Sequence, residues 1–287
     1  MKINPVKGTN DYLPADTALR DSLQGTILEV YRAAGYNRIT TPILEDIENL
    51  DKSEGGENLN LIFKVLKRGE KLEAALAEGD SQALSDMGLR YDLTLPLSRY
   101  YSNNGAQLPS PFKALQMGSV WRADRPQRGR FRQFTQCDID ILGDATNMAE
   151  IELILATTTA LGRICPKNAF TVRINDRGIL KGMALYCGFP ENGLDQVFIT
   201  LDKMDKIGLD GVKAELLELG YAAESVEKYA ELLSGLGEDA AAVRGLGETL
   251  AGVLDTKTAE NLANIMDTVT EVAETDFKLA FDPTLVR

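Results

Sequence analysis

The residues best suited to chemistry lie in one basic stretch of an acidic chain. Residues 122–132 read RADRPQRGRFR, with five arginines and one aspartate, whereas the 287-residue chain carries 43 acidic and 31 basic residues. Guanidinium groups match phosphate oxygens in bidentate geometry, and several converging arginines offset charge that develops during group transfer. The stretch therefore predicts a polyphosphate site. The alternative is a solvated basic loop that pairs with neighbouring acids.

A second set of polar residues predicts a pocket of the opposite charge. Asp92 and Thr94 alternate with apolar residues at the end of a predicted strand, Leu89–Leu93, so their side chains should project from one sheet face. Gln136 and Asp140, four residues apart on another predicted strand, also share a face. An isolated Asp-x-Thr pair is usually structural. Beside the second pair, it predicts a polar pocket with net negative charge.

The composition excludes several other kinds of site. The chain contains no histidine, so histidine triads, histidine metal sites and histidine general bases are excluded, and a carboxylate-and-arginine mechanism stays open. Neither a Gly-x-Gly-x-x-Gly run nor a Gly-x-x-x-x-Gly-Lys-Ser/Thr loop is present. The three cysteines, Cys137, Cys165 and Cys187, lack metal-ligand spacing. We expect reduced, mostly buried thiols and assign no metal ligand.

The arginines need elements that hold them in place. The apolar run from Phe112 to Val120 predicts a buried strand, and residues 131–139 predict a second strand with partial alternation. Pro126 and Gly129 interrupt regular structure between them, so we expect a hairpin with a long loop. Arg122 and Arg132, the first and last arginines of that loop, lie next to the predicted strands, so we expect their side chains to point toward a sheet face.

The amino-terminal part predicts a helix and a strand. Apolar residues recur at spacings of three and four from Leu19 to Ala34, and Gly35 is a plausible C-terminal cap. Tyr36–Leu44 predicts a strand at an edge or an interface, because Pro42 lacks a ladder donor. Next come a strand at 61–66 and a helical stretch through Glu78.

The carboxyl-terminal half is mainly helical. We expect a helix over 147–164, a strand over 169–174 and a turn or helix start at 175–178. Helical patterns then continue to about Thr275, and their alanine-, leucine- and glutamate-rich composition predicts a small helical insertion from 190 to 271.

Composition also bounds the location and the partners. The chain has no uninterrupted apolar stretch of membrane-span length and no secretory leader pattern, so we expect a cytoplasmic protein without a membrane partner. Its net charge of −12 disfavours non-specific binding of nucleic acid over the whole surface. Any RNA contact must therefore be local.

Four segments, in their order along the chain, resemble the signatures of class II aminoacyl-tRNA synthetases. The basic stretch with its continuation QFTQ is similar to the second class II motif, in the form found in histidyl-tRNA synthetases. Residues 7–14 (KGTNDYLP) resemble the amino-terminal signature of that family, and residues 36–45 resemble the first class II motif with its proline. Residues 89–96 (LRYDLTLP) resemble its amino-acid-binding strand. The resemblance runs with gaps from about Ile3 to Gln196.

This resemblance implies an α+β fold, a class II synthetase-like antiparallel sheet flanked by helices with a helical insertion. The expected domains are a catalytic core over 1–189, the insertion over 190–271 and a return to the core over 272–287. A homodimer through helix 17–34 and strand 36–45 is also implied, although the proline is equally consistent with a simple strand end. The insertion approaches the tRNA acceptor arm in the family, but its acidic composition fits a packing or interface module equally well.

The resemblance gives the acidic pocket a substrate, L-histidine. Carried over by position, Asp92 and Thr94 would hold the α-ammonium group, while Gln136 and Asp140 would lie near the amino group and the imidazole ring. A carboxylate can accept a charge-assisted hydrogen bond from either cation. Many family members carry glutamate at the positions of Asp92 and Asp140. The shorter aspartate side chains here alter how far these carboxylates extend toward the ligand.

The resemblance also gives the basic stretch a nucleotide, ATP, with Mg²⁺ for which no protein ligand can be assigned. Arg122 would contact the α-phosphate, Asp124 the adenine amino group, and Phe134 would stack on adenine. At least one of Arg130 and Arg132 would reach phosphate, whereas Arg125 and Arg128 would meet solvent or tRNA. Histidine would form histidyl-adenylate and then pass to tRNA(His), in a reaction that needs no protein nucleophile.

The last residues leave two interpretations open. Arg287 matches the family's second α-phosphate arginine and is, with Arg122, a catalytic candidate. The histidine-pocket tyrosines, the third class II motif and an anticodon-binding domain have no counterpart in residues 1–287, so we expect this chain alone to be weak or inactive in adenylation. The alternative is a non-catalytic, histidine-sensing paralogue that resembles the regulatory subunit of ATP phosphoribosyltransferase. The retained arginine loop argues against that alternative.

Overall fold

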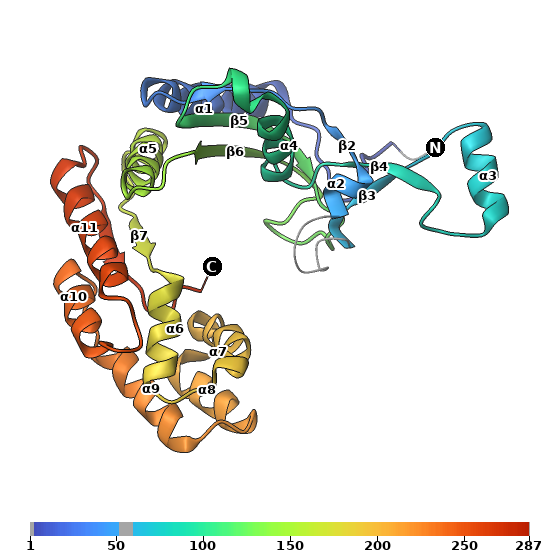
Figure 1. Ribbon diagram of the computed structural model, residues 1–287. Helices are drawn as coiled ribbons and strands as arrows, with labels where there is room; N and C mark the ends of the chain where they lie inside the picture. Colours follow the sequence, from blue (N-terminus) through green and yellow to red (C-terminus); the bar gives the residue numbers. More distant parts are fainter. Residues whose placement is uncertain (1–2, 52–59, 287) are drawn as a thin grey trace. The chain divides into compact units, whose positions relative to one another are not determined.

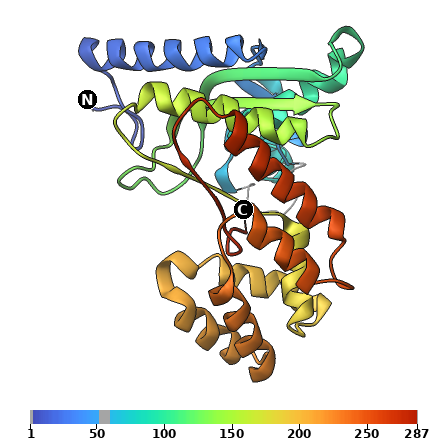
Figure 2. The same ribbon diagram turned by 90° about the vertical axis from the view of Figure 1, so that its left-hand side faces the viewer.

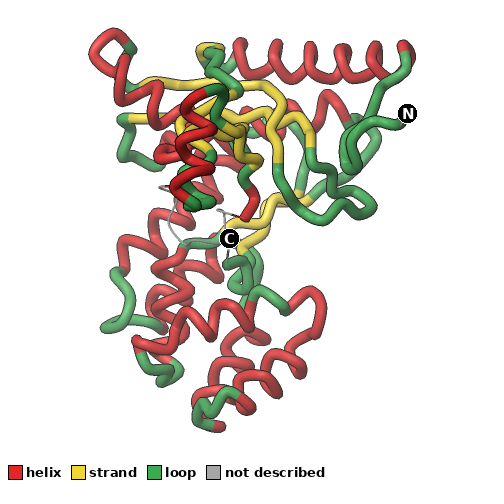
Figure 3. The backbone as a smooth tube through the Cα atoms, turned by 90° about the vertical axis from the view of Figure 1, so that its right-hand side faces the viewer, coloured by secondary structure: helices red, strands yellow, loops and turns green. Residues whose placement is uncertain are grey.

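The computed structural model describes residues 3–51 and 60–286 and divides the chain into two compact units, residues 1–145 and 146–287 (Figure 1). Most strands belong to the first unit, and the second unit is mainly helical (Figure 3). The α+β class, with helices and an antiparallel sheet, is confirmed.

The central feature of the first unit is the hairpin of β5 (Phe112–Trp121) and β6 (Gln133–Leu142). The strands pair antiparallel over their whole length, from Phe112↔Leu142 to Trp121↔Gln133, and the short strand β1 (Asn37–Arg38) pairs parallel with β5. The predicted hairpin with its long loop is therefore confirmed.

Helix α1 (Pro14–Ala33) lies along one face of this sheet, as Figure 1 and Figure 2 show. Arg20 Nη2 donates to Thr135 Oγ1 on β6 at 3.0 Å. The predicted cap is confirmed: Gly35 has a φ of 87°, its N–H donates to Arg32, and the next N–H donates to Tyr31. This pattern closes a helix with a left-handed residue, which favours glycine.

The predicted strand at Tyr36–Leu44 is wrong as a single element. The chain pairs with β5 only at Asn37–Arg38, leaves that sheet, and begins β2 at Leu44. Pro42 lies in the intervening segment, where its missing N–H breaks no ladder. One predicted strand thus serves two different sheets.

A second antiparallel sheet has the order β2 (Leu44–Asp46), β4 (Ser85–Leu89), β3 (Phe63–Leu66). The predicted strand at 89–93 is displaced, because β4 ends at Leu89 and α4 already begins at Thr94. The described part of this unit also contains the helices α2 (Ile47–Asp51), α3 (Glu70–Glu78) and α4 (Thr94–Asn104) and the 3-10 turn η2 (Gly105–Gln107).

The second unit contains two parallel strands, β7 (Thr171–Ile174) and β8 (Lys278–Phe281). Its helices are α5 (Met148–Ile164), α6 (Arg177–Tyr186), η3 (Glu191–Gly193), α7 (Leu194–Leu201), α8 (Met204–Glu218), α9 (Ala223–Gly235), α10 (Ala240–Thr249) and α11 (Thr256–Val272). Side chains of α6–α11 and Phe281 share one apolar core. The boundaries of the predicted insertion domain stay a prediction.

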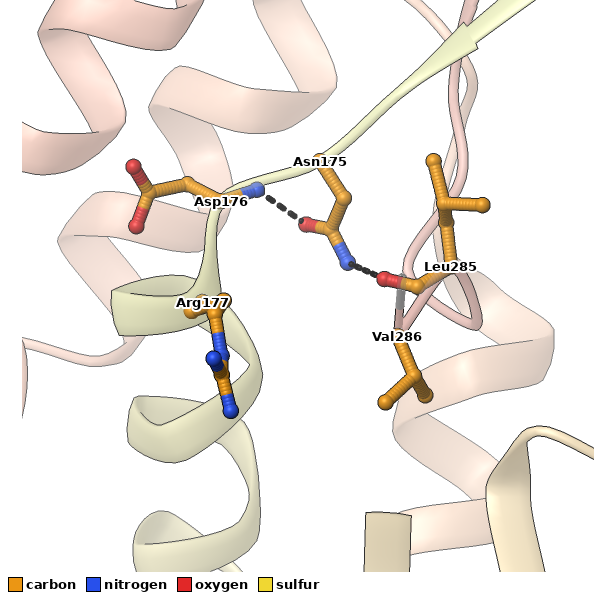
Figure 4. A pocket seen from close by; sticks show the side chains of 5 residues that line it. All are labelled: Asn175, Asp176, Arg177, Leu285 and Val286. Atoms are coloured by element: carbon orange, nitrogen blue, oxygen red, sulfur yellow. Dashed lines mark hydrogen bonds between the residues drawn. The ribbon is translucent and has the colours of Figure 1, made fainter. Parts of the chain in front are cut away.

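The predicted turn after β7 is confirmed and lines a cavity of about 510 Å³ (Figure 4). Asp176 caps α6 by accepting a hydrogen bond from the N–H of Gly178 at 2.6 Å. Asn175 joins this turn to the last described segment, because its Nδ2 donates to the carbonyl of Leu285 at 3.1 Å.

The described residues also bear on the cysteines and on membrane crossing. Cys187 is buried, Cys137 is half-buried and Cys165 is exposed, so the burial expected for most of the thiols is complete at Cys187, partial at Cys137 and absent at Cys165. None of the helices in the described part of the chain combines the length and apolar character that crossing a bilayer requires.

Candidate functional site

Four side chains of β6 point from one face of the hairpin. They alternate along the strand, and the cross-strand register places each opposite a residue of β5 on the same face. The pairs are Phe134 with Val120, Gln136 with Gly118, Asp138 with Gln116, and Asp140 with Ala114. We call this side the ligand face. The expectation that Gln136 and Asp140 share a face is confirmed, whereas Asp138 between them was missed, although the same two-residue spacing indicates it.

Two acceptors on the ligand face lack a donor. Gln136 Oε1 and Asp140 Oδ2 are buried, and no group in residues 3–51 or 60–286 donates a hydrogen bond to either atom. A buried acceptor without a donor costs about 1–3 kcal/mol, so such atoms usually have a partner. A ligand with N–H groups is the partner that this arrangement fits.

Arg122 extends from the end of β5 toward the ligand face. Its Nε donates to the carbonyl of Tyr91 at 3.0 Å, and its Cζ lies 5.1 Å from the centre of the Phe134 ring. The backbone N–H of Arg122 donates to the carbonyl of Arg132 at 2.9 Å. Arg122 is thus fixed beside the aromatic end of the ligand face.

The carboxylates of this region have raised pKa values. Burial raises the pKa of Asp138 to about 6, with further contributions from the charges of Asp140 and Asp92, and Arg122 opposes the shift. Burial also raises the pKa of Asp140. For Asp92, burial outweighs hydrogen bonds from backbone N–H groups and the charge of Arg122. Three carboxylates and one guanidinium therefore interact at the ligand face.

Asp92 and Thr94 do not project from a common sheet face, contrary to prediction. Asp92 lies between β4 and α4, where its Oδ1 accepts a hydrogen bond from the N–H of Leu95 at 3.2 Å. Thr94 is the first residue of α4 and is exposed. The structure brings Asp92 within electrostatic reach of Asp138 and Arg122. No described hydrogen bond joins Thr94 to Gln136 or Asp140.

Arg90 is a buried cation that links the segments around the site. It is 6% exposed, and its guanidinium donates to the carbonyls of Thr41 at 2.9 Å, Pro42 at 3.3 Å and Ser119 at 3.0 Å. Its backbone carbonyl accepts from the N–H of Trp121 at 3.0 Å. Burial lowers the pKa of Arg90. A charged residue inside the apolar run around position 90 was the only indication of this role in the sequence.

The arginine loop closes on itself at its tip. Gln127 and Arg130 exchange backbone hydrogen bonds, with Gly129 between them at a φ of 78°. Arg130 Nη1 lies 3.8 Å from Asp124 Oδ1, and its side chain is 59% exposed. Arg132 Nε donates to the carbonyl of Asp124 at 3.1 Å. Asp124, Arg130 and Arg132 are thus brought together.

The remaining candidates lie apart from this cluster or cannot be placed. Arg125 and Arg128 are exposed, in keeping with the expected contact with solvent. Arg287 lies outside the described residues. Within residues 3–51 and 60–286, no three carboxylate or thiol side chains gather in a group that could hold a metal ion. The described residues therefore assign no protein ligand to Mg²⁺.

Comparison with known proteins identifies relatives of the whole chain. Residues 8–287 match the family model described as histidyl-tRNA synthetase. A histidine–tRNA ligase from Leifsonia xyli is 42% identical over 295 residues, which cover 99% of this chain and 67% of that protein. The chain spans about two thirds or less of the length of the curated relatives it matches, with values of 67%, 53% and 63% for three of them.

Solved structures show the same fold. The crystal structure of histidyl-tRNA synthetase from Nostoc sp. PCC 7120 matches with a TM-score of 0.84 and 25% identity, over 100% of this chain and 62% of that one. A structure from Bacillus halodurans, described as an ATP phosphoribosyltransferase regulatory subunit/histidyl-tRNA synthetase, matches with a TM-score of 0.75 and 23% identity. That match covers 99% of this chain and 69% of the other and shows likeness of fold alone.

Proposed function

This chain belongs to the histidyl-tRNA synthetase family, and on that premise we propose that its first unit binds histidine and ATP and joins them as histidyl-adenylate. The observation that carries the proposal is the position of Arg122 between an aromatic ring and a carboxylate face. Its Cζ lies 5.1 Å from the Phe134 ring, while Asp92 and Asp138 interact with its charge. An amino acid and a nucleotide can therefore meet at one cation.

The amino acid binds on the ligand face. The buried, unpaired oxygens of Gln136 and Asp140 accept hydrogen bonds from the α-ammonium group and an imidazole N–H. Asp92 adds negative charge on the ammonium side. Thr94, at the start of α4, is proposed as a further contact to the α-ammonium group. The raised pKa values of Asp92 and Asp140 reflect buried carboxylates that a cation would stabilise.

ATP binds at the aromatic end of this face. Adenine stacks on Phe134, and its amino group donates a hydrogen bond to Asp124. Arg122 contacts the α-phosphate, and Arg130 or Arg132 contacts the remaining phosphates. The Arg130 side chain is exposed, and its guanidinium forms only a weak ion pair with Asp124, at 3.8 Å. It can therefore turn toward such a ligand. Arg287, which the family resemblance also assigns to the α-phosphate, lies outside the described residues.

The chemistry is displacement at phosphorus. A carboxylate oxygen of histidine forms a bond to the α-phosphorus as the bond to the bridging oxygen breaks, and pyrophosphate leaves with that electron pair. Arg122 stabilises the negative charge that builds on the α-phosphate. The ribose hydroxyl of tRNA(His) then attacks the histidyl carbonyl and gives up its proton, the bond between the carbonyl carbon and the phosphate oxygen breaks, and AMP leaves with that electron pair and the proton. Side chains of this unit bind and orient, and none forms a covalent intermediate.

We also propose a homodimer, a surface partner for the helical insertion and a cytoplasmic location. The apolar side chains of Leu19, Leu23, Ile43 and Leu44 are 38–61% exposed in the helix and strand region expected to form a homodimer. A second copy of the chain would cover them. The helices of the predicted insertion are proposed to approach tRNA or a neighbouring protein surface, and the protein is proposed to be cytoplasmic.

Histidine-dependent exchange of pyrophosphate into ATP tests the proposed function. The protein that carries these residues should catalyse exchange with histidine and not with other amino acids. Binding of histidine without any exchange would instead favour the alternative of a histidine-sensing paralogue related to the regulatory subunit of ATP phosphoribosyltransferase. Absence of histidine binding would overturn both.

A further inference from the structure

Asp138 occupies the middle of the ligand face, and the function described above gives it no contact with a substrate. It is two residues from Gln136 and two from Asp140 along β6, and all three side chains share a face. Its charge interacts with those of Asp140, Asp92 and Arg122. Any ligand that bridges Gln136 and Asp140 must therefore pass over Asp138.

The residue opposite Asp138 does not neutralise it. Gln116 pairs with Asp138 across the hairpin, but its amide is engaged on other partners. Its Nε2 donates to the carbonyl of Leu93 at 2.9 Å, and its Oε1 accepts from Thr41 Oγ1 at 3.2 Å. Among the described residues, the charges that act on Asp138 are those of two carboxylates, Asp140 and Asp92, and one guanidinium, Arg122. The guanidinium of Arg90 also packs on this face, against Gly118, but the charge of the buried Glu45 acts on it. The ionised ligand face therefore carries an excess of negative charge.

We propose that Asp138 is a specificity residue that makes the site take up histidine with its imidazole protonated. This inference rests on the proposed function and names the ionic form of the substrate. Arg122 balances the carboxylate of the amino acid, so three acidic side chains remain for its cationic groups. The α-ammonium group supplies one positive charge, and an imidazolium supplies a second. A neutral imidazole has an N–H at one nitrogen only, and its other nitrogen carries a lone pair that carboxylates repel. An imidazolium offers an N–H at both nitrogens.

Binding of histidine as an imidazolium requires the complex to take up protons from solution at neutral pH. Free imidazole has a pKa of about 6.5, so most histidine is neutral at the ring at pH 7.5. A site with excess negative charge raises the pKa of the bound ring, and the complex therefore takes up protons. Bringing a cation to Asp138 lowers the pKa of its carboxyl, which is about 6 in the free site, so proton release offsets uptake near pH 6. Uptake should be clearest at pH 7.5.

Calorimetry of histidine binding in buffers of different ionisation enthalpy measures this uptake directly. Wild type should take up protons at pH 7.5, and Asp138→Asn should take up fewer. The same experiment compares histidine with 1,2,4-triazole-3-alanine, whose ring is a much weaker base. Asp138→Asn should reduce the preference for histidine by about tenfold, the factor that corresponds to one pKa unit. Asp138→Glu, which keeps the charge, should retain more of the preference.

The controls separate this inference from the proposed function. Glu73→Gln removes an exposed charge on α3 and should leave both proton uptake and preference unchanged. If wild type does not bind histidine, the proposed function fails. If wild type binds histidine without proton uptake, or if folded Asp138→Asn keeps the full preference, the role of Asp138 is overturned while the proposed function stands. If the asparagine variant does not fold, absence of proton uptake by wild type still overturns the proposal, and Asp138→Glu tests the residue itself.

Discussion

The guanidinium of Arg90 fills the space that a side chain at Gly118 would need. A Cβ built on Gly118 collides with Nη2 of Arg90, and Gly118 itself lies opposite Gln136 on the ligand face. Glycine is required there by close packing, since no positive φ is recorded for this residue. The same guanidinium binds carbonyls of Thr41, Pro42 and Ser119, so one clash would disturb several contacts.

Gly118→Ala should therefore lower the free energy of unfolding by about 1–3 kcal/mol, the usual effect of overpacking a filled site. Urea denaturation measures the change. Gly245→Ala provides the matched control, because a Cβ at that exposed position of α10 meets no atom within 4 Å. The control should be more stable by roughly 0.5–1 kcal/mol, as expected for alanine in a helix. Equal effects of the two substitutions would contradict the role of Arg90.

The buried carboxylate of Glu45 supports the helix that follows Asp92. Glu45 has a 4% exposed side chain, and both its oxygens accept hydrogen bonds from Arg99 on α4 at 2.7 Å. Glu45→Ala should lower the free energy of unfolding by about 3 kcal/mol, because it breaks a largely buried ion pair. Glu48→Ala, at an exposed acid on α2, is the control and should change stability by about 0.5 kcal/mol or less. If both substitutions lowered the free energy of unfolding by about 0.5 kcal/mol or less, the result would show that water solvates Arg99 as well as Glu45 does.

The ligand face was predictable where one local pattern determined it, and not where distant segments meet. Alternation along residues 133–142 placed Gln136 and Asp140 together, and it should have included Asp138. Asp92 was expected on a strand because its neighbours are apolar, but those residues are buried at the start of a helix instead. The role of Arg90 depends on carbonyls at positions 41, 42 and 119, which no local pattern relates. Residues 36–44 read as one strand because periodicity does not say which sheet receives each part.

Stability should fall as pH rises through the weakly acidic range. The pKa values of Asp92, Asp138 and Asp140 are raised in the folded protein, that of Asp138 to about 6, so the folded state binds more protons than the unfolded state above about pH 4. Their contribution favours folding below the unfolded pKa and is lost as pH rises through the folded values. Urea denaturation should show Asp138→Asn to be more stable than wild type at pH 7.5, with the difference reduced at pH 4.5. A difference that does not depend on pH would contradict the titration of Asp138.

Arg122 should contribute to the transition state far more than to folding. Its guanidinium is fixed by the carbonyl of Tyr91 and by the Phe134 ring, so it needs little reorganisation to meet charge on a phosphate. In the protein that carries these residues, Arg122→Ala should lower histidine-dependent ATP–pyrophosphate exchange by about 10²–10³-fold, as loss of a preorganised donor does. Arg128→Ala is the matched control, because Arg128 belongs to the same loop and is exposed; it should retain most of the exchange. Circular dichroism should show both variants folded. Full exchange by Arg122→Ala would remove this residue from the proposed mechanism, and equal losses in both variants would indicate that the loop contributes only its overall charge.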